Sequence, residues 1–596
     1  MKSWNVRIIQ KGISLLLICL LFPLMICMAG TDLNGDMADY YSRVLEAVQE
    51  GGYTAPDGVL VRVSADSYTN HEGMKPTQGS LEGSILQTEE TSSVTWTVEL
   101  PQTGLYWVVV SYFPADGATL SPSRKILING EQPFREASRI VFGRRWVDEG
   151  DPVKNVTGDE VCPVQQEISV WSEKALNDSQ GKNAYPLQFL MQAGRNTITF
   201  EYIGEPLELE WLSVCSVKET PTYAEVSENY TADAAKERLR IEAEARKNVA
   251  GKSEASILPQ PNSDPTVTPY EATQVRLNTI GAYSWSEGHQ EISWKLEVPE
   301  TGLYQIHLRV LQNWNNGLSS YRSLRINGKI PFSEMGCVTF RYDTAWQNCV
   351  LGDENGTPYL FELTKGENIL SMQVEFGKAA EIAQELSDVA GDLSDVIFDI
   401  TRITGYTPDP NYNYHLETEI PGLMDRLQSI RQQIEHCRQD IHQISGKNST
   451  MEGNLKSAVS DLNRLIDRPT FLPTKLADLN TMLTNLSDWS ATLQTGPLAI
   501  DYLELLPPGT KVTQKNATFW QRIWATLKNF RASFTKDYNA VSGNAGKEDP
   551  LDVWISRSTR TGHFAPLPPH GRSRQPSRMR HLRTLHTVLA ESLIQL

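Results

Sequence analysis

Cysteine is scarce in this 596-residue chain and follows no regular spacing. Two of its seven cysteines, Cys19 and Cys27, lie close to the N-terminus, which leaves five in the rest of the chain. An odd number of irregularly spaced cysteines excludes a disulfide framework and a zinc-finger pattern. Isolated thiols are the simplest interpretation, and a bond between Cys337 and Cys349 stays open as the alternative.

Positive charge is also scarce, since the formal net charge is -17 at pH 7. Nucleic-acid binding without sequence preference needs a basic surface, so this composition excludes that class of function. A neutral or cationic ligand is compatible with it. No stretch beyond the N-terminal segment has the length and apolarity needed to cross a membrane.

The one long apolar run lies at the N-terminus. Basic residues precede the mostly apolar residues 13–28, and the small pair Ala29 and Gly30 follows. This is the order of a secretory signal peptide, so residues 1–29 are predicted to be removed on export. An uncleaved membrane anchor is the alternative, because a short apolar run can still lie in a bilayer.

Common catalytic motifs are missing as well. The sequence contains no Gly-x-Ser-x-Gly elbow, no phosphate-binding loop and no His-Glu-x-x-His zinc motif. Carboxylates are abundant, but a glycosidase site depends on their separation in space, which a sequence does not give. Because the repeat described next leaves little unassigned chain, we expect a protein that is not an enzyme.

A long internal repeat organises the chain. Residues 96–106 read WTVELPQTGLY, and residues 294–304 read WKLEVPETGLY. At the same offset Arg124 matches Arg322, and both copies continue into Ile-Asn-Gly and then Pro-Phe. A repeat of this length indicates two homologous modules.

Each copy has the pattern of a β-sandwich. Alternating residues before the Pro-x-Thr-Gly turn predict one strand, and the β-branched and aromatic residues 105–113 predict the next. The Asn-Gly dipeptides lie between apolar strands, which predicts tight hairpins with positive φ. Several short strands with such turns are typical of a sandwich.

The last strand of the second copy is displaced along the chain. Residues 206–214 of the first copy read PLELEWLSV, whereas the matching PLAIDYLEL lies at residues 497–505, far beyond Phe376. The second sandwich is therefore predicted to be interrupted by residues 377–496. The predicted first module spans residues 53–217, and the second spans residues 239–376 plus 497–506.

Inside the interruption the apolar period lengthens from two to about three and a half residues, which indicates packed helices. Two segments, 382–400 and 423–444, have this apolar period, and each forms an apolar seam; two further amphipathic stretches follow them. Ser449 and Glu452 have the spacing of a capping box at the start of the third helix. Four helices returning to the parent sheet predict an antiparallel bundle. We expect a spacer with its own core; a partner-binding surface is the alternative. The seam residues are Ile382, Leu386, Val389, Leu393, Val396, Ile400, Leu423, Leu427, Ile430, Ile434, Cys437, Ile441 and Ile444.

Carboxylates mark both ends of the second module, in Ile241-Glu242-Ala243-Glu244 and in Ile500-Asp501-Tyr502. The combination resembles carbohydrate-binding modules with the galactose-binding-like jelly-roll fold. That resemblance implies a structural Ca²⁺ held by Glu242, Glu244 and Asp501, since calcium takes about six to eight oxygen ligands. Solvated carboxylates are the alternative, and the first copy departs from the pattern because Ser64 replaces the first Glu.

Sugar recognition needs an aromatic platform and a few polar groups. Tryptophans outside the repeated strands are candidates, and so are the two repeated arginines. Packing in the core is the alternative for each Trp, and solvation is the alternative for each Arg. The candidate ligand-binding residues are Trp146, Trp171, Trp314, Trp346, Arg124 and Arg322.

The order of the remaining segments resembles large extracellular solute-binding proteins of carbohydrate ABC transporters, in which tandem sandwiches precede a two-lobed binding domain. Residues 511–549 contain an aromatic-rich amphipathic helix and a linker, and residues 550–556 read PLDVWIS, like the first strand of that domain. Residues 557–596 then carry seven Arg and one Glu, a break in composition. We expect a shifted or truncated reading frame there; a disordered native tail is the alternative.

Together these resemblances imply an extracellular or cell-surface carbohydrate-binding protein of sugar uptake, truncated before its main binding domain. An oligo- or polysaccharide is the expected ligand, and transporter permease subunits are the expected partners. The noncatalytic part of a secreted polysaccharide-degrading enzyme and a structural surface protein are the alternatives.

Overall fold

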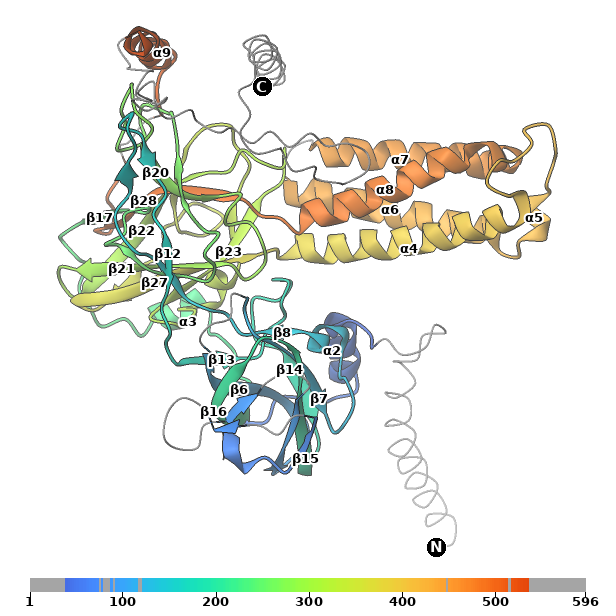
Figure 1. Cartoon of the computed structure of the whole chain (residues 1–596), viewed down its shortest axis with the longest axis horizontal. Helices are drawn as coiled ribbons and strands as arrows, with labels where there is room; N and C mark the ends of the chain where they lie inside the picture. Colours follow the sequence, from blue (N-terminus) through green and yellow to red (C-terminus); the bar gives the residue numbers. More distant parts are fainter. Residues whose placement is uncertain are drawn as a thin grey trace, which may run out of the picture. The chain divides into compact units, whose positions relative to one another are not determined.

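The computed structural model describes residues 38–534, with gaps at 74–76, 79–85, 89–91, 116–119, 446–448 and 513–515. The predicted signal peptide, the segment 550–556 and the tail 557–596 lie outside the described residues. Two β-sandwiches and a helical bundle make up the described chain (Figure 1), which confirms the predicted fold class.

The first sandwich packs two antiparallel sheets around one apolar core. Its strands are β1 (Leu60–Ser64), β2 (Asn70–Glu72), β3 (Thr77–Gln78), β4 (Leu86–Thr88), β5 (Ser93–Leu100), β6 (Gly104–Pro114), β7 (Ser123–Ile128), β8 (Ile140–Val141), β13 (Ser172–Ala175), β14 (Gln188–Met191), β15 (Gly194–Gly204) and β16 (Leu207–Ser216). One sheet has the order β13-β6-β16-β4-β3, with β1 beside β16 and β14 beside β6. The other has the order β2-β5-β15-β7-β8.

The second sandwich repeats this arrangement around its own core. Its strands are β17 (Leu239–Glu242), β18 (Val249–Lys252), β19 (Pro259–Pro261), β20 (Leu277–Ala282), β21 (Glu291–Val298), β22 (Gly302–Leu311), β23 (Ser320–Ile326), β24 (Val338–Phe340), β25 (Gln347–Val350), β26 (Phe361–Leu363), β27 (Gly366–Glu375) and β28 (Leu498–Leu506). In one sheet β28 lies between β20 and β22, and it also pairs with β17. In the other, β27 lies between β21 and β23.

Two strands from the first module's part of the sequence extend a sheet of the second. They are β9 (Trp146–Asp148) and β12 (Gln165–Glu167), and between them lies the hairpin of β10 (Val153–Lys154) and β11 (Glu160–Val161). β9 pairs with β18, so the sheet has the order β12-β9-β18-β21. A buried ion pair between Lys252 and Asp148, with 2.7 Å between Nζ and the carboxylate, joins the two modules there.

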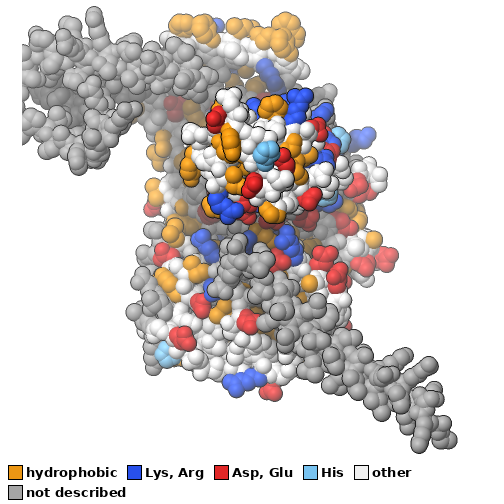
Figure 2. All heavy atoms as spheres, turned by 90° about the vertical axis from the view of Figure 1, so that its right-hand side faces the viewer, with side chains coloured by type: hydrophobic (Ala, Val, Ile, Leu, Met, Phe, Trp, Pro, Cys, Tyr) orange, Lys and Arg blue, Asp and Glu red, His pale blue; other side chains and the backbone are white. Residues whose placement is uncertain are grey.

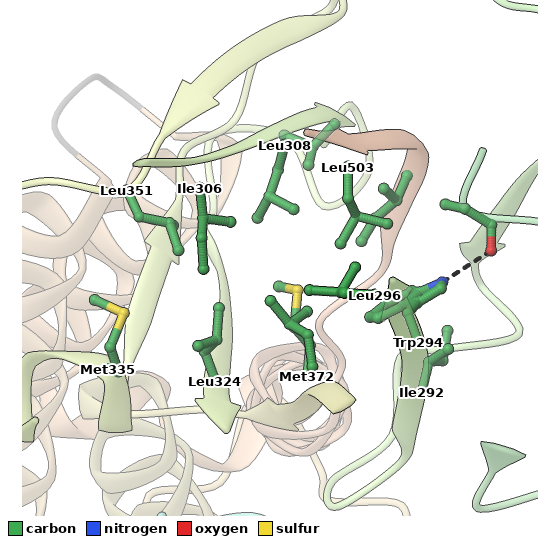
Figure 3. Close-up of a cluster of buried hydrophobic side chains, with 14 of the residues drawn as sticks. Ile292, Trp294, Leu296, Ile306, Leu308, Leu324, Met335, Leu351, Met372 and Leu503 are labelled. Atoms are coloured by element: carbon green, nitrogen blue, oxygen red, sulfur yellow. Dashed lines mark hydrogen bonds between the residues drawn. The ribbon is translucent and has the colours of Figure 1, made fainter. Parts of the chain in front are cut away.

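The repeated tryptophans have the same environment in both sandwiches. Trp96 and Trp294 are each 0% exposed. The Trp96 indole N–H donates to the carbonyl of Ala65 at 2.9 Å, and that of Trp294 donates to Ala243 at 2.9 Å, the bond drawn in Figure 3. Each indole therefore ties a core strand to the chain just after the module's first strand.

The two Asn-Gly hairpins are also alike. Asn129 and Gly130 have φ of 54° and 85°, and Asn327 and Gly328 have φ of 51° and 80°. Positive φ at both central residues is the type I′ conformation that the dipeptide favours. The predicted tight turns are therefore confirmed.

A short helix precedes each sandwich, and the sequence pattern did not reveal that these helices correspond. They are α2 (Tyr41–Glu50) and α3 (Tyr223–Ser227). The carboxylate of Glu136 accepts the Tyr41 N–H at 2.8 Å, and Glu334, its counterpart in the repeat, accepts the Tyr223 N–H at 2.9 Å. An acidic group at a helix N-terminus satisfies a free backbone N–H and favours the helix dipole.

The bundle lies between β27 and β28 in the sequence. Its helices are α4 (Lys378–Thr404), α5 (Leu416–Glu419), α6 (Leu423–Ser445), α7 (Thr450–Asp467) and α8 (Leu476–Leu493). α4 contacts α6 and α8, and α6 contacts α7 (Figure 1). Every predicted seam residue is buried except Ile444, which is half-buried. The 3₁₀ turns η4 (Pro469–Phe471) and η5 (Pro473–Lys475) join α7 to α8, and the sandwiches contain η1 (Ala65–Ser67), η2 (Arg135–Ser138) and η3 (Ser333–Gly336).

The start of α7 forms one half of the predicted capping box. The Ser449 hydroxyl accepts the backbone N–H of Glu452 at 3.1 Å, as an N-cap should. The Glu452 carboxylate does not complete the box; it accepts hydrogen bonds from Arg438 at 3.2 Å and His442 at 3.1 Å on α6. The Glu452 side chain therefore bonds to α6 and not to the N-cap backbone of its own helix.

The repeated arginines lie inside the sandwiches, at the corner where the chain crosses from one sheet to the other. Arg124 donates through Nη1 to the carbonyls of Gly204 at 3.1 Å and Glu205 at 3.0 Å, between β15 and β16. Arg322 donates through Nη2 to the carbonyl of Gly496 at 2.7 Å, just before β28. With 1% and 0% of their surface exposed, they cannot bind a sugar, which corrects the prediction of ligand-binding arginines.

Both ends of the bundle insertion meet at the start of β23. Tyr321 pairs with Glu375, the last residue of β27. The neighbouring Ser320 hydroxyl donates to the carbonyl of Pro497 at 2.7 Å, where the chain returns. The chain thus leaves and re-enters the sandwich at one place, and the bundle has its own apolar core, to which the sandwich adds Leu318 and Tyr321.

The variant Trp294→Ala should lower the free energy of unfolding of the second sandwich by about 3–5 kcal/mol, because it leaves a cavity and removes a buried hydrogen bond. Urea unfolding monitored by circular dichroism measures the loss. The control is Trp520→Ala, at a side chain that is 75% exposed; we expect a change within about 0.5 kcal/mol. Equal losses in the two variants would contradict this account of the core.

Replacing residues 378–495 with a short Gly-Ser linker should leave the second sandwich folded, because the two ends of the insertion meet and the bundle has its own core. The measurement is the cooperativity and midpoint of thermal unfolding of the shortened chain. A broad, noncooperative transition would show that the sandwich depends on the bundle.

Candidate functional site

Two of the candidate tryptophans lie beside the loop that joins β19 to β20. Trp346 is 4% exposed and packs with Val267 of this loop, and Trp314 lies at the edge of the same apolar cluster. The rings of Trp314 and Tyr283 meet edge to face, with centroids 5.9 Å apart. Because Trp346 has no exposed face, it supports the loop and is not a stacking platform. Trp314 is half-buried, so part of its ring reaches solvent.

The other two candidate tryptophans lie within the sequence range of the first module. Trp146 is half-buried on β9, next to β18 of the second sandwich. Trp171 is half-buried too, and its ring centroid is 5.5 Å from that of Phe113. Neither residue lines the aromatic hollow described below.

The candidate carboxylates lie where the first and last strands of the second module meet. Glu242 pairs with Tyr502 in the ladder of β17 and β28. The N–H of Ala243 donates to the carbonyl of Asp501 at 3.0 Å, which keeps Glu244 close to β28. Antiparallel pairing thus brings together residues that lie far apart in the sequence.

Two of these carboxylates are buried without enough partners. Glu244 is 9% exposed and Asp501 is 0% exposed. Among the described residues, no hydrogen bond of good geometry reaches Glu244 Oε2 or either carboxylate oxygen of Asp501. Burial raises the pKa of Glu244 to about 9, with Glu242 and Asp501 adding to it, and burial raises the pKa of Asp501 to about 7 although Arg309 opposes this. A bound divalent cation would coordinate these oxygen atoms and would also offset the negative charge of the two carboxylates.

The type of donor atom at this place suits calcium, which binds oxygen ligands. Glu244 and Asp501 offer hard oxygen atoms, whereas Glu242 is paired with Arg240 at 3.1 Å. Within the described chain, the one set of three His, Cys, Asp or Glu ligand atoms lying within 4.8 Å of one another is in the bundle. The three candidate carboxylates would therefore have to move closer together to surround an ion.

In the first module the equivalent carboxylates, Asp66 and Glu210, belong to exposed residues and also accept hydrogen bonds from hydroxyls. Asp66 accepts a hydrogen bond from the Ser64 hydroxyl at 2.6 Å. Glu210, which corresponds to Asp501, accepts one from the Ser111 hydroxyl at 2.8 Å. This agrees with the departure of the first copy from the calcium pattern.

The loop between β19 and β20 connects the carboxylates to a second feature. The Thr266 hydroxyl accepts a hydrogen bond from Arg309 Nη2 at 2.6 Å, and Arg309 Nε lies 3.3 Å from the Asp501 carboxylate. Asp264 holds the turn by accepting the Thr266 N–H at 2.9 Å. Thr266 therefore has a defined position between Asp501 and the outer side of the loop.

An aromatic hollow of about 770 Å³ lies on that outer side, against α9 (Phe519–Ser533). The Tyr270 hydroxyl bonds to the Asn529 side chain at 3.0 Å, and Arg522 lies 3.7 Å from Asp264, so the helix is held to the loop at two points. Small-ligand sites usually have volumes of roughly 300–1,000 Å³. The lining residues are Pro265, Thr266, Tyr270, Trp520, Gln521, Ile523, Trp524, Ala525, Leu527 and Lys528.

Two tryptophans on α9 are the residues that the sequence pattern did not single out as a site. Trp520 is 75% exposed and Trp524 is 72% exposed. Figure 2 shows hydrophobic side chains gathered at the top of the molecule, at the height of α9 in Figure 1. Their spacing of four residues, which places them on one helix face, was the available signal.

The bundle carries the similarity to a known family. Residues 381–493 match the family model described as bacterial solute-binding protein, 4-helix bundle domain. The match begins within α4 and ends at the last residue of α8, so it covers the insertion and neither sandwich. The insertion is therefore similar to the bundle domain of bacterial solute-binding proteins.

Several solved structures resemble parts of the chain. A family 35 carbohydrate binding module from Clostridium thermocellum is 16% identical, covering 27% of this chain and 100% of that chain with a TM-score of 0.16. A CBM35 from Paenibacillus barcinonensis is 16% identical over 26% of this chain and 99% of that chain, with a TM-score of 0.17. The catalytic unit of a GH87 α-1,3-glucanase from Streptomyces thermodiastaticus is 16% identical over 31% of this chain and 32% of that chain, with a TM-score of 0.18.

No curated protein matches the sequence. Within the described ranges, no helix combines the length and the apolarity that a bilayer crossing requires. All five cysteines in the described chain are free thiols, so the alternative Cys337–Cys349 bond is not formed.

Calcium should raise the midpoint of thermal unfolding, and EDTA should lower it, if Glu244 and Asp501 hold an ion. A ligand at a hundredfold excess over its Kd adds about 2.7 kcal/mol of stability. The double variant Glu244→Gln, Asp501→Asn should lose this response, whereas the matched variant Asp66→Asn in the first module should keep it. An EDTA-insensitive midpoint in the unmodified protein would remove calcium from the account.

Proposed function

We propose that this protein is an exported carbohydrate-binding component of sugar uptake, related to the solute-binding proteins of carbohydrate ABC transporters. The observation that carries the proposal is the solute-binding-type bundle at residues 381–493, inserted between two strands of a sandwich. An oligo- or polysaccharide is its ligand, and transporter permease subunits are its partners. It acts outside the cytoplasm, by binding and without catalysis.

The aromatic hollow is the proposed place of sugar contact. Trp520 and Trp524 present large, exposed indole faces on which the apolar face of a pyranose can stack. Thr266, Gln521 and Lys528 add polar groups along the same lining for the hydroxyls. A mostly apolar hollow with a few polar groups is the usual composition of a small-ligand site.

A calcium ion at Glu244 and Asp501 is proposed to have a structural role. Arg309 connects Asp501 to the hollow: its Nε lies 3.3 Å from the Asp501 carboxylate, and its Nη2 donates to the Thr266 hydroxyl at 2.6 Å. An ion that orders Asp501 would therefore help to fix Thr266 at the edge of the hollow. Sugar binding should be stronger with calcium than with EDTA.

The bundle is proposed to be a spacer. Its apolar seams face one another in a core separate from that of the second sandwich. A helix set that buries its own apolar faces leaves mainly polar side chains outside. The shortened chain described above tests this role, because loss of binding to permease subunits on removal of the bundle would identify a partner-binding surface instead.

Affinity electrophoresis of the full chain, in gels containing β-glucan, mannan, xylan or pectin, tests carbohydrate binding. We expect retardation by at least one polysaccharide. The double variant Trp520→Ala, Trp524→Ala should weaken it about tenfold or more, because a Trp contact buried on binding commonly contributes about 2 kcal/mol or more.

The control variant is Phe530→Ala, on the same helix. Phe530 is 63% exposed, does not line the hollow and contacts the ring of Phe534, so its loss should leave retardation unchanged. Unretarded migration in every gel, with calcium and with EDTA, would contradict carbohydrate binding. The genes beside this one test the transport role separately: two permease genes support uptake, whereas glycosidase genes support the enzyme-associated alternative.

A further inference from the structure

The bundle brings one imidazole and two carboxylates together on neighbouring helices. His436 Nδ1 lies 3.1 Å from the Glu385 carboxylate and 3.6 Å from the Asp440 carboxylate. One ligand atom from each of the three residues lies within 4.8 Å of the other two. The group is separate from the hollow and from the candidate calcium ligands, and it does not depend on the proposed sugar binding.

Helix geometry explains why these side chains converge. His436 and Asp440 are four residues apart on α6, so they lie on the same face, one turn from each other. Glu385 comes from α4, which packs against α6. The side chains of Glu385, His436 and Asp440 are 30%, 64% and 35% exposed, so an ion from solvent can reach them.

The charge of this group is not balanced by nearby cations. Among the described residues, neither Glu385 nor Asp440 forms an ion pair with a lysine or an arginine, and both share the single imidazole of His436. Two carboxylates and one neutral imidazole give a site that a divalent cation would neutralise. An imidazole ligand favours transition metals, whereas calcium prefers oxygen alone.

The next histidine on α6 provides an internal comparison. His442 lies 3.1 Å from the Glu452 carboxylate and is 59% exposed, close to the exposure of His436. Glu452 is also paired with Arg438, at 3.2 Å. That carboxylate already has its cation, and in the described part of the chain no second carboxylate completes a ligand set there.

The observed spacings also suit a metal ion. With Zn²⁺ bonds of about 2.0–2.1 Å in a tetrahedral site, ligand atoms lie about 3.3 Å apart. The separations of 3.1 Å and 3.6 Å bracket that value. A hydrogen-bonded histidine has similar spacings, so the convergence of a third ligand is the feature that separates a metal site from an ion pair.

We propose that Glu385, His436 and Asp440 bind a divalent transition-metal ion, represented by Zn²⁺, and so link α4 to α6. Three protein ligands leave the fourth tetrahedral position for water. The ion would cross-link two helices of the bundle. The stability of the bundle would then depend on bound metal as well as on apolar packing.

Isothermal titration of the full, chelator-treated chain with Zn²⁺ alone tests the proposal. We expect one site that His436→Ala weakens by about tenfold or more, since even the loss of an outer-shell partner costs a metal site about that much. Glu385→Gln, on the other helix, should weaken it similarly. The matched variant His442→Ala should bind Zn²⁺ as the unmodified chain does.

Three outcomes would overturn the proposal. They are the absence of Zn²⁺ binding, retention of binding by His436→Ala or Glu385→Gln, and an equal loss in the His436 and His442 variants. Thermal unfolding of each variant in chelator shows whether the bundle is still folded. In the unmodified chain Zn²⁺ should raise the midpoint, and in His436→Ala this shift should disappear while the sugar-binding assay is unaffected.

Discussion

A buried guanidinium has to be hydrogen-bonded, because an uncompensated charge inside a protein costs several kcal/mol. In both sandwiches the repeated arginine meets this requirement with backbone carbonyls of the segment that crosses between the sheets. Burial lowers the pKa of Arg124 to about 10 and that of Arg322 to about 9, so both stay protonated at neutral pH. The Arg322 guanidinium also lies 4.0 Å from the centre of the Trp285 ring. The crossing is thereby held in place whatever length of chain connects the two strands.

That constraint explains how one fold accommodates two different connections. In the first sandwich β15 ends at Gly204 and β16 begins at Leu207, whereas in the second the whole bundle lies between β27 and β28. The cost of closing a longer loop rises slowly with its length, and the bundle offsets that cost by burying its own apolar seams. The aromatic hollow lies on α9 and the β19–β20 loop, and the histidine–carboxylate group lies on the bundle, whereas the candidate calcium ligand Asp501 lies on β28, a strand of the repeat. Function is commonly carried in this way by segments added to a stable scaffold.

The two copies differ in how they satisfy equivalent polar groups. In the first, hydroxyls at Ser64 and Ser111 bond to the carboxylates. In the second, Glu244 and Asp501 are buried with oxygen atoms that lack good partners. Buried polar groups without partners are costly and are found where a ligand, an ion or a catalytic role compensates. This difference supports the proposal that a cation binds the second copy.

The sequence by itself determined the local features: the repeat, the strand alternation, the Asn-Gly turns and the helical seams all follow from periodicity and backbone preference, and the structure has them. Only the tertiary structure decided that Arg124 and Arg322 are interior, that β9 and β12 extend the second module's sheet, and that Trp520 faces a hollow beside Tyr270. It also decided that Glu385 meets His436 across two helices. The physical reason is that periodicity assigns a face to each element, whereas contacts between distant segments depend on how the whole chain packs.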